Sequence, residues 1–441
     1  MRERVGALRL PRAYLGYLCS RCTYSSLLYA WAFTAVIFCD SIFTKIQFTY
    51  RHFPDLVHPV AYTYIVVFSL IVLLGLLNLY VQKGYRIYVD RVMILVGIYV
   101  LSAMLSQVMN RHHMADTEPL HRLRLLLFPI IIAFFFVQTL DRARVRVVAR
   151  VLVAFALVNL PFAFAGMYLG RGQGLVFSHV SAVFSDRNLL ARFLSIAHAF
   201  LLIEFLARPS KRILSFSVGA MAAMFACVTL LLSRSGYGMY FFVNMLILSQ
   251  SENKTLKRWL PVFAGIVLIV FGAMFYLRVR AEKMNIWPSS DIGRIGSILA
   301  GINMIKASPV YGVGYGMSIP RYVEFQDKHF PGLRDIDSIH NIYVNVFAEQ
   351  GAVGLAVYLL LNAAVLSALW RVIRKEPFAR RTLELWCFVS IATYLLHGIV
   401  YHTIDFEGIY WIIIALAVVC LRTRREAGRM AGAIPGRGSE S

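Results

Sequence analysis

The chain has 441 residues, of which 59% are hydrophobic and only 15% are charged, and its formal net charge at pH 7 is +22. A soluble domain carries about 25% charged residues, whereas apolar runs long enough to cross a bilayer recur along this whole chain. This composition excludes a soluble globular protein and indicates an all-α integral membrane protein. Its positive charge is expected to anchor cytoplasmic loops to anionic lipid instead of binding nucleic acid.

Hydropathy predicts about twelve transmembrane helices. They lie at roughly 25–45, 60–80, 92–110, 123–140, 147–168, 188–206, 213–232, 236–249, 259–277, 352–370, 385–403 and 408–421. Lys and Arg are concentrated in the N-terminal segment, in every second loop and in the C-terminal tail, which places both termini in the cytoplasm. The chain thus divides into residues 1–277 with the first nine spans, a large outer loop at 278–351, and residues 352–441 with the last three spans and a basic tail.

The outer loop at 278–351 is too long and too apolar for a simple linker. Its pattern predicts a helix that Asp291 caps and that ends at Pro309 and the following glycines, Gly312, Gly314 and Gly316. One face of this helix is apolar and comprises Ile295, Ile298, Leu299, Ile302 and Ile305. We therefore expect the helix to lie along the outer boundary between membrane and water.

The sequence DSIHNIYVNVFAEQGAVG, residues 337–354, places a histidine just outside a predicted span. Residues 340–350 predict about three helical turns, with Asp337 or Ser338 as the cap. His340 then stays outside the hydrocarbon, where an imidazole titrates near neutral pH and is suited to work as a general base. The alternative is a surface or capping histidine without a catalytic role.

Three further polar residues lie in the same segment. Asn341 either positions a sugar or caps the helix. Glu349 and Gln350, at the predicted membrane boundary, are expected to be structural.

Several arginines lie on the predicted outer side, at the ends of spans or of the loop helix. Arg187, Asn188 and Arg192 share one face where the sixth span begins. Arg294 opens the loop helix, and Arg234 lies in the turn between the seventh and eighth spans. Arginine is the side chain best suited to a phosphate, so these residues are candidates for binding an anionic substrate. The alternative for each is an arginine that reaches from a span end to the water.

Asp405 and Glu407 lie in the outer turn between the last two spans, close in sequence to His397 and His402. A carboxylate there can orient an imidazole. His402 and Asp405 share a helical face, but no third ligand at a metal-binding spacing accompanies them. The same holds for the looser groups His112, His113 and His121, and Cys19 and Cys22. We therefore predict neither a metal nor another cofactor.

Three patches of the sequence resemble the O-antigen ligase and O-antigen polymerase superfamily of bacterial envelope glycosyltransferases, and within it the O-antigen ligases (WaaL type). The first is FSDRNLLARFL, in which Arg187 stands where many members have a proline, and the second is SRSG at 233–236. The third and most specific combines GR at 293–294, SPVYGVGYG at 308–316 and HNIYVNVFAEQGAVG at 340–354. The span pattern of nearly the whole chain is also similar.

The resemblance implies a GT-C-like glycosyltransferase of the bacterial inner membrane whose active site faces the periplasm. It implies an inverting, metal-independent transfer of a glycan from undecaprenyl diphosphate to a sugar hydroxyl of lipid A–core. His340 then matches the family's catalytic base, and Arg187, Arg192 and Arg294 are candidates for holding the diphosphate. Arg234, Asn341 and Asp405 are further candidates for binding substrate.

Two other readings remain open. One is a sister activity, either a Wzy-type polymerase or a protein O-oligosaccharyltransferase, which the sequence separates poorly from a ligase. The other is a lipid or solute transporter, which should place its polar groups at mid-membrane in broken helices. This chain places most of them at the outer face.

Overall fold

The computed structural model of the protein describes residues 68–77, 79, 87–111, 118–171, 187–208, 211–231, 233–255, isolated positions between 257 and 276, and residues 289–326, 339–401 and 408–432. All regular structure in these residues is helical, as the predicted all-α class requires. The helices are α5 (Arg91–Met109), α6 (Glu118–Thr139), α7 (Arg142–Arg171), α8 (Arg187–Ala207), α9 (Lys211–Leu230), α10 (Arg234–Gln250), α12 (Ser289–Ala307), α13 (Tyr322–Phe325), α14 (Ile342–Lys375), η5 (Phe378–Arg380), α15 (Thr382–His397) and α16 (Gly408–Gly432).

Five helices in the described residues are long and apolar enough to cross a membrane. These candidate spans are Arg91–Met109, Arg122–Thr139, Arg142–Ala165, Arg187–Ala207 and Ile342–Lys375. Shorter apolar helices lie at Phe68–Leu77, Phe216–Leu230 and Thr382–His397. Each of these helices overlaps a predicted span, so the prediction of a multi-pass helical membrane protein is confirmed. The count of twelve stays a prediction, and the first predicted span lies outside the described residues.

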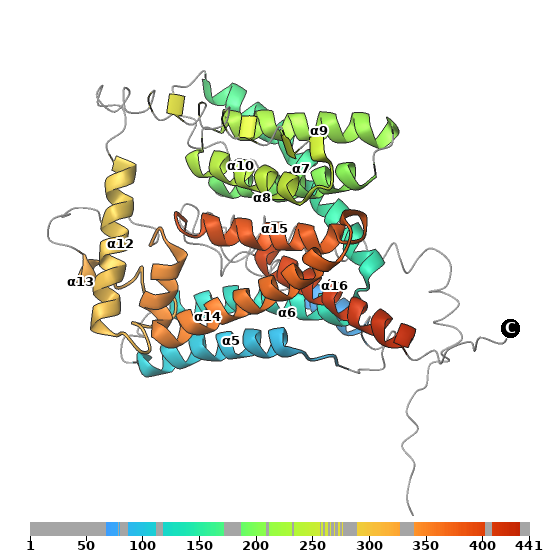
Figure 1. Ribbon diagram of the computed structural model, residues 1–441. Helices are drawn as coiled ribbons and strands as arrows, with labels where there is room; N and C mark the ends of the chain where they lie inside the picture. The colour runs from blue at the N-terminus through green and yellow to red at the C-terminus, as the bar shows by residue number, and fades with distance from the viewer. Residues whose placement is uncertain are drawn as a thin grey trace, which may run out of the picture.

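Helices α8 and α15 form the interior of the bundle. Helix α8 packs against α7, α9, α10 and α15, and α15 also packs against α10, α14 and α16. In Figure 1, α8, α9 and α10 lie on one side of α15, and α5, α6 and α14 lie on the other. Helix α8 is therefore buried along most of its length, whereas α5 exposes large apolar side chains on the outside of the bundle. Exposed apolar side chains are expected where a helix faces lipid.

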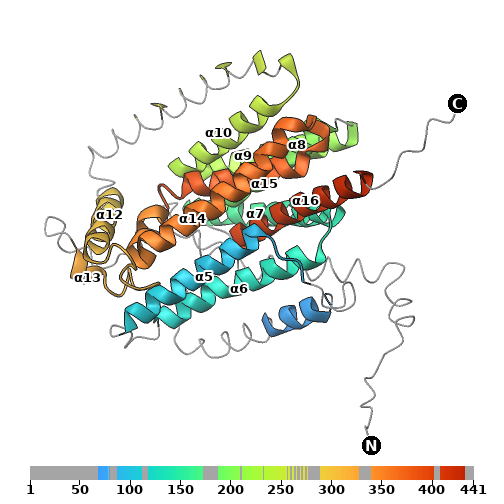
Figure 2. The ribbon, with the colours of Figure 1, turned by 60° about the horizontal axis from the view of Figure 1, so that its bottom comes forward.

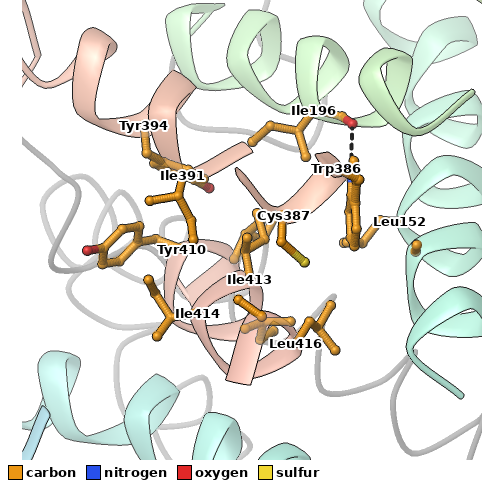
Figure 3. Close-up of a cluster of buried hydrophobic side chains, with 14 of the residues drawn as sticks. Leu152, Ile196, Trp386, Cys387, Ile391, Tyr394, Tyr410, Ile413, Ile414 and Leu416 are labelled. Carbon is orange, nitrogen blue, oxygen red and sulfur yellow. Dashed lines mark hydrogen bonds between the residues drawn. The ribbon is translucent and has the colours of Figure 1, made fainter. Parts of the chain in front are cut away.

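Aromatic and aliphatic side chains fix α15 between its neighbours (Figure 3). The indole Nε1 of Trp386 on α15 donates a hydrogen bond to the carbonyl of Ile196 on α8, 3.1 Å away. On the other side, the rings of Tyr394 on α15 and Tyr410 on α16 meet edge to face, with 5.4 Å between centroids. Such contacts on both sides hold the helix in one position, including its C-terminal end at His397.

Two helices at one end of the bundle depart from the direction of the others. Helix α12 lies crosswise to the long helices (Figures 1 and 2) and packs against the start of α14. Helix α14 bends at Gly351, whose φ of 67° and ψ of −169° are not helical. The bend divides it into a first part, 342–350, and a long apolar part, in agreement with the predicted span that begins at residue 352. We call this end of the bundle the α12 end.

The opposite end of the bundle is held by arginines and acidic residues. The carboxylate of Glu384, at the start of α15, is fully buried and pairs with Arg142 at the start of α7 and with Arg424 on α16. Arg422 of α16 donates to the backbone carbonyls of Val137 and Leu140 at the end of α6. These residues belong to the segments that the charge distribution assigns to the cytoplasmic side, and the fold gathers them at one end.

Candidate functional site

His340 lies at the α12 end, in the short stretch that leads into α14. Its backbone N–H donates to the hydroxyl of Ser297 on α12, 3.3 Å away. The preceding Ile339 is buried against Gly301 of α12, where a β-carbon would lie 2.6 Å from Val344. The small residue therefore allows α12 and the start of α14 to approach closely, and this contact fixes the backbone of His340.

Asn341 caps α14, so the predicted cap at Asp337 or Ser338 is wrong. The Asn341 side-chain oxygen accepts the N–H of Val344, 3.0 Å away, and the helix begins at Ile342. An amide this close to the first turn satisfies an N–H that the helix leaves unpaired. Asp337 and Ser338 themselves lie outside the described residues. Of the two roles open to Asn341, the structure therefore supports the cap.

Two further hydrogen bonds connect the start of α14 with the turn that follows α15. The Asn341 side-chain nitrogen donates to the carbonyl of Ile399, 2.9 Å away. The backbone N–H of Ile342 donates to the carbonyl of Gly398, 2.8 Å away. The residues that flank His340 are thus bound to the turn at 398–401, and α15 ends at His397 rather than at the predicted residue 403.

Arg192 is buried at the same place, with only 1% of its surface exposed. Its Nη1 lies 3.0 Å from Nδ1 of His397. Its guanidinium carbon lies 4.4 Å from the ring centroid of Tyr394, and the ring of His397 stacks on that of Tyr401 with 4.8 Å between centroids. The guanidinium can only donate a hydrogen bond, so Nδ1 of His397 is the acceptor and a neutral ring carries its proton on Nε2. Arg192 is therefore directed into the bundle rather than toward water.

The two patches around Arg187 and Arg234 are joined by hydrogen bonds. The side-chain oxygen of Asn188 accepts from the hydroxyls of Ser233, 2.6 Å away, and Ser235, 3.2 Å away. Ser233 also caps α10 by accepting the N–H of Gly236. Arg187 is partly exposed at the start of α8, and Arg234 is exposed at the start of α10. Of the two arginines near the start of α8, Arg187 is the more exposed.

Arg294 is partly exposed on α12, one turn before Ser297. The helix begins at Ser289, so Asp291 lies inside its first turn and the predicted cap there is wrong. The face of α12 that packs on the protein consists of Gly296, Ser297, Ala300, Gly301 and Met304. The opposite, isoleucine-rich face is left partly exposed, with Ile295 at 53%, as a helix at a membrane boundary requires.

The glycine-rich loop after α12 lies across the bend of α14. Gly312, Gly314 and Gly316 all have positive φ, and the N–H groups of Val313 and Gly314 donate to the carbonyls of Ala348 and Glu349, respectively. A β-carbon on Gly312 would overlap the backbone of Glu349. Only glycine allows two backbones to pass at this distance in this conformation.

Polar side chains near the end of α5 hold this loop and the bend, and the sequence patterns had not singled them out. Ser106 donates to the carbonyl of Glu349, Gln107 to that of Tyr315, and Asn110 to that of Gly312. Ser102 bonds to the side chain of Gln350, which also donates to the hydroxyl of Tyr99. The only signal of this role in the sequence is the helical spacing of these residues, which places them in one polar stripe on the otherwise apolar α5.

Glu349 is buried, 1% exposed, and its carboxylate accepts from the N–H and hydroxyl of Ser318, 3.3 and 2.5 Å away. The Ser318 hydroxyl also lies 3.2 Å from the side-chain oxygen of Asn345. The expected structural role of Glu349 and Gln350 matches these contacts, because both side chains bind the elements that surround the bend.

The candidates around Asp405 are not part of the described structure. Asp405, Glu407 and His402 lie outside the described residues, as do His112, His113, Cys19 and Cys22. Among the residues close in sequence to Asp405, His397 is described, and it lies against Arg192.

Residues 219–359 match the family model described as O-antigen ligase. The matched segment runs from α9 to the middle of α14 and includes Arg234, Arg294, His340 and Asn341, whereas Arg187 and Arg192 precede it. A search of curated proteins finds no match to the chain.

Proposed function

We propose that this multi-pass membrane protein is a glycosyltransferase that completes lipopolysaccharide, because residues 219–359 match the O-antigen ligase family model. Its donor is a glycan on undecaprenyl diphosphate, and its acceptor is a sugar hydroxyl of lipid A–core. The reaction takes place at the α12 end, on the periplasmic face of the bacterial inner membrane, with both termini in the cytoplasm. It inverts the anomeric centre and requires no metal.

His340 removes the proton from the acceptor hydroxyl in this proposal. The acceptor oxygen attacks the anomeric carbon of the donor sugar while the bond from that carbon to the diphosphate breaks. Undecaprenyl diphosphate leaves with the bonding electron pair, and arginines neutralise the charge that develops on it. Arg187 and Arg294 take this role because both are partly exposed, Arg187 as the first residue of α8 and Arg294 in the second turn of α12.

One observation supports the proposal most directly. The family match runs through α12 and the start of α14, where the hydroxyl of Ser297 accepts the backbone N–H of His340 one turn after Arg294. The backbones of Arg294 and His340 therefore lie close together on two packed elements. One residue carries a guanidinium suited to a diphosphate, and the other carries an imidazole suited to proton removal. General acid–base catalysis and charge neutralisation of the leaving group require this proximity.

The first prediction tests His340 in living cells. The wild-type gene is expressed in a Gram-negative strain that lacks its own ligase, and lipopolysaccharide is separated on a gel. The wild-type protein should restore the ladder of glycan on lipid A–core. His340→Ala should give no ladder and should accumulate lipid-linked glycan, because no other group in its place removes the acceptor proton.

The control for this experiment is Lys306→Ala, an exposed residue on the far end of α12. It should restore the ladder at the same membrane level of protein as His340→Ala. A full ladder from His340→Ala would contradict the role of this residue. Wild-type protein that lengthens the lipid-linked glycan but leaves lipid A–core bare would contradict the ligase and indicate a polymerase.

A further inference from the structure

The buried Arg192 and His397 connect two elements that are far apart in the sequence. Arg192 lies on α8 and His397 is the last residue of α15, 205 positions later. Their hydrogen bond of 3.0 Å is enclosed by the rings of Tyr394 and Tyr401. A charged hydrogen bond with little access to water is stronger and more directional than the same bond on a surface.

The turn that begins at His397 accepts hydrogen bonds from the start of α14. The backbone of this turn continues from His397 to Gly398 and Ile399, whose carbonyls receive the N–H of Ile342 and the side chain of Asn341. His340 immediately precedes Asn341. A displacement of His397 therefore moves the acceptors that hold the residues next to His340.

We infer that Arg192 and His397 are positioning residues, which fix the turn at 398–401 and through it the backbone of His340. This inference rests on the proposed function, in which His340 is the base. Arg192 then acts on the catalytic rate and leaves the binding of the donor diphosphate to Arg187 and Arg294. Its 1% exposure and its contact with His397 are the reasons for separating it from the partly exposed arginines.

The test measures kcat and the donor KM separately, in the purified full-length protein reconstituted in liposomes. The donor is undecaprenyl-diphosphate-linked glycan, titrated at saturating lipid A–core. Arg192→Lys keeps the charge and loses the planar fork. His397→Phe keeps a ring against Tyr401 and loses the acceptor, whereas His397→Asn keeps an acceptor near the place of Nδ1 and loses the ring.

Arg192→Lys and His397→Phe should each lower kcat by about tenfold or more, because a base displaced by about 1 Å is poorly aligned. The donor KM should stay within about twofold of wild type, since the diphosphate is bound elsewhere. The double variant should be no slower than the slower single variant, because the two residues act as one unit. His397→Asn should recover part of the lost kcat.

The control matched to His397→Phe is His198→Phe, on the helix that carries Arg192 (α8). His198 is also buried, and its ring nitrogens lie 2.7 Å from the hydroxyl of Tyr240 and 3.0 Å from the side-chain oxygen of Asn244. The same exchange there removes a buried imidazole and its hydrogen bonds without touching the turn. It should lower thermal stability as His397→Phe does, and leave kcat unchanged.

Three results would overturn the inference. The first is a rise in donor KM with kcat retained in Arg192→Lys, which would make Arg192 a diphosphate ligand. The second is wild-type kcat in His397→Phe, and the third is an equal loss of kcat in His198→Phe. Wild-type protein without transferase activity, or fully active His340→Ala, would instead contradict the proposed function itself.

Discussion

Arg294 is the residue on which the donor side of the proposed reaction depends most. It lies in the second turn of α12, and Ser297, one turn further along the helix, holds the backbone of His340. A hydrogen bond from an arginine to a charged oxygen contributes about 1.5–3 kcal/mol. Loss of this contact should therefore weaken donor use by about tenfold or more.

The corresponding prediction is that Arg294→Ala raises the donor KM and Lys306→Ala, on the same helix, does not. Both are measured by titrating undecaprenyl-diphosphate-linked glycan against the reconstituted protein. Arg294→Lys should lie between the two, because an ammonium keeps the charge without the paired donors. An unchanged donor KM in Arg294→Ala would remove this residue from the diphosphate site.

Some contacts of single residues could not be predicted from the sequence. The sequence left two roles open for Asn341, and the structure uses both ends of its amide, the oxygen for the cap and the nitrogen for Ile399. The contact of Arg192 with His397 was not predictable either, because the two residues are 205 positions apart and no local pattern reveals such a contact.

At the level of elements, the bend of α14 separates His340 and the first part of the helix from the long apolar part. Gly351 has a φ of 67°, and a β-carbon there would overlap the carbonyl of Val310 in the glycine-rich loop. The N–H of Ala352 donates to the carbonyl of Pro309, 2.9 Å away, and ties the loop to the bend. The bend and the loop therefore require each other.

Gly351→Ala should lower the stability of the protein by about 1–3 kcal/mol from backbone strain alone, and by more if the loop is displaced. Gly219→Ala is the control, because a β-carbon on this helical glycine meets no atom within 4 Å. That variant should be as stable as wild type or slightly more so. The measurement is the midpoint of thermal unfolding in detergent. Equal midpoints for Gly351→Ala and wild type would show that the bend is not strained.

Sequence patterns predicted the apolar helices well and the orientation of α12 only in part. Length and hydropathy are sufficient for a span, because a helix in hydrocarbon must satisfy its own backbone and present an apolar surface. On α12 the same rule predicts that the isoleucine-rich face is buried in an apolar environment. The face that packs on α14 is instead the one with small residues, including Gly301 and Ala300. Close packing selects small residues, and hydropathy does not register them.

On the scale of the whole molecule, the bundle has two ends of different chemistry. The α12 end gathers the candidate base and the exposed or partly exposed arginines around the starts of α8, α10, α12 and α14. The opposite end holds the helices together through Glu384, Arg142 and Arg424. The distribution of Lys and Arg along the sequence predicted which segments share an end. It did not predict which charges pair, because pairing depends on how α7, α15 and α16 pack.

The opposite end yields the last prediction, which separates stability from catalysis. The carboxylate of Glu384 is fully buried between Arg142 and Arg424, and both arginines also donate to the carbonyl of Arg380. Glu384→Gln keeps the shape, removes the carboxylate that pairs with Arg142, and leaves Arg424 paired with Glu376 alone. Breaking a fully buried ion pair costs about 3–5 kcal/mol, and the cost here should be smaller because Arg142 and Arg424 are 30% and 21% exposed.

Glu384→Gln should therefore unfold at a lower temperature in detergent. Its kcat and donor KM at low temperature should stay near wild type, because the proposed site lies at the other end of α15. Asp141→Asn at the same end is the control: its side chain is 52% exposed, and its partner Arg144, 3.6 Å away, is 29% exposed. An exposed pair contributes at most about 1 kcal/mol, so this variant should behave as wild type. A loss of kcat in folded Glu384→Gln would mean that the two ends are coupled through α15, since this helix carries Glu384 at one end and His397 at the other.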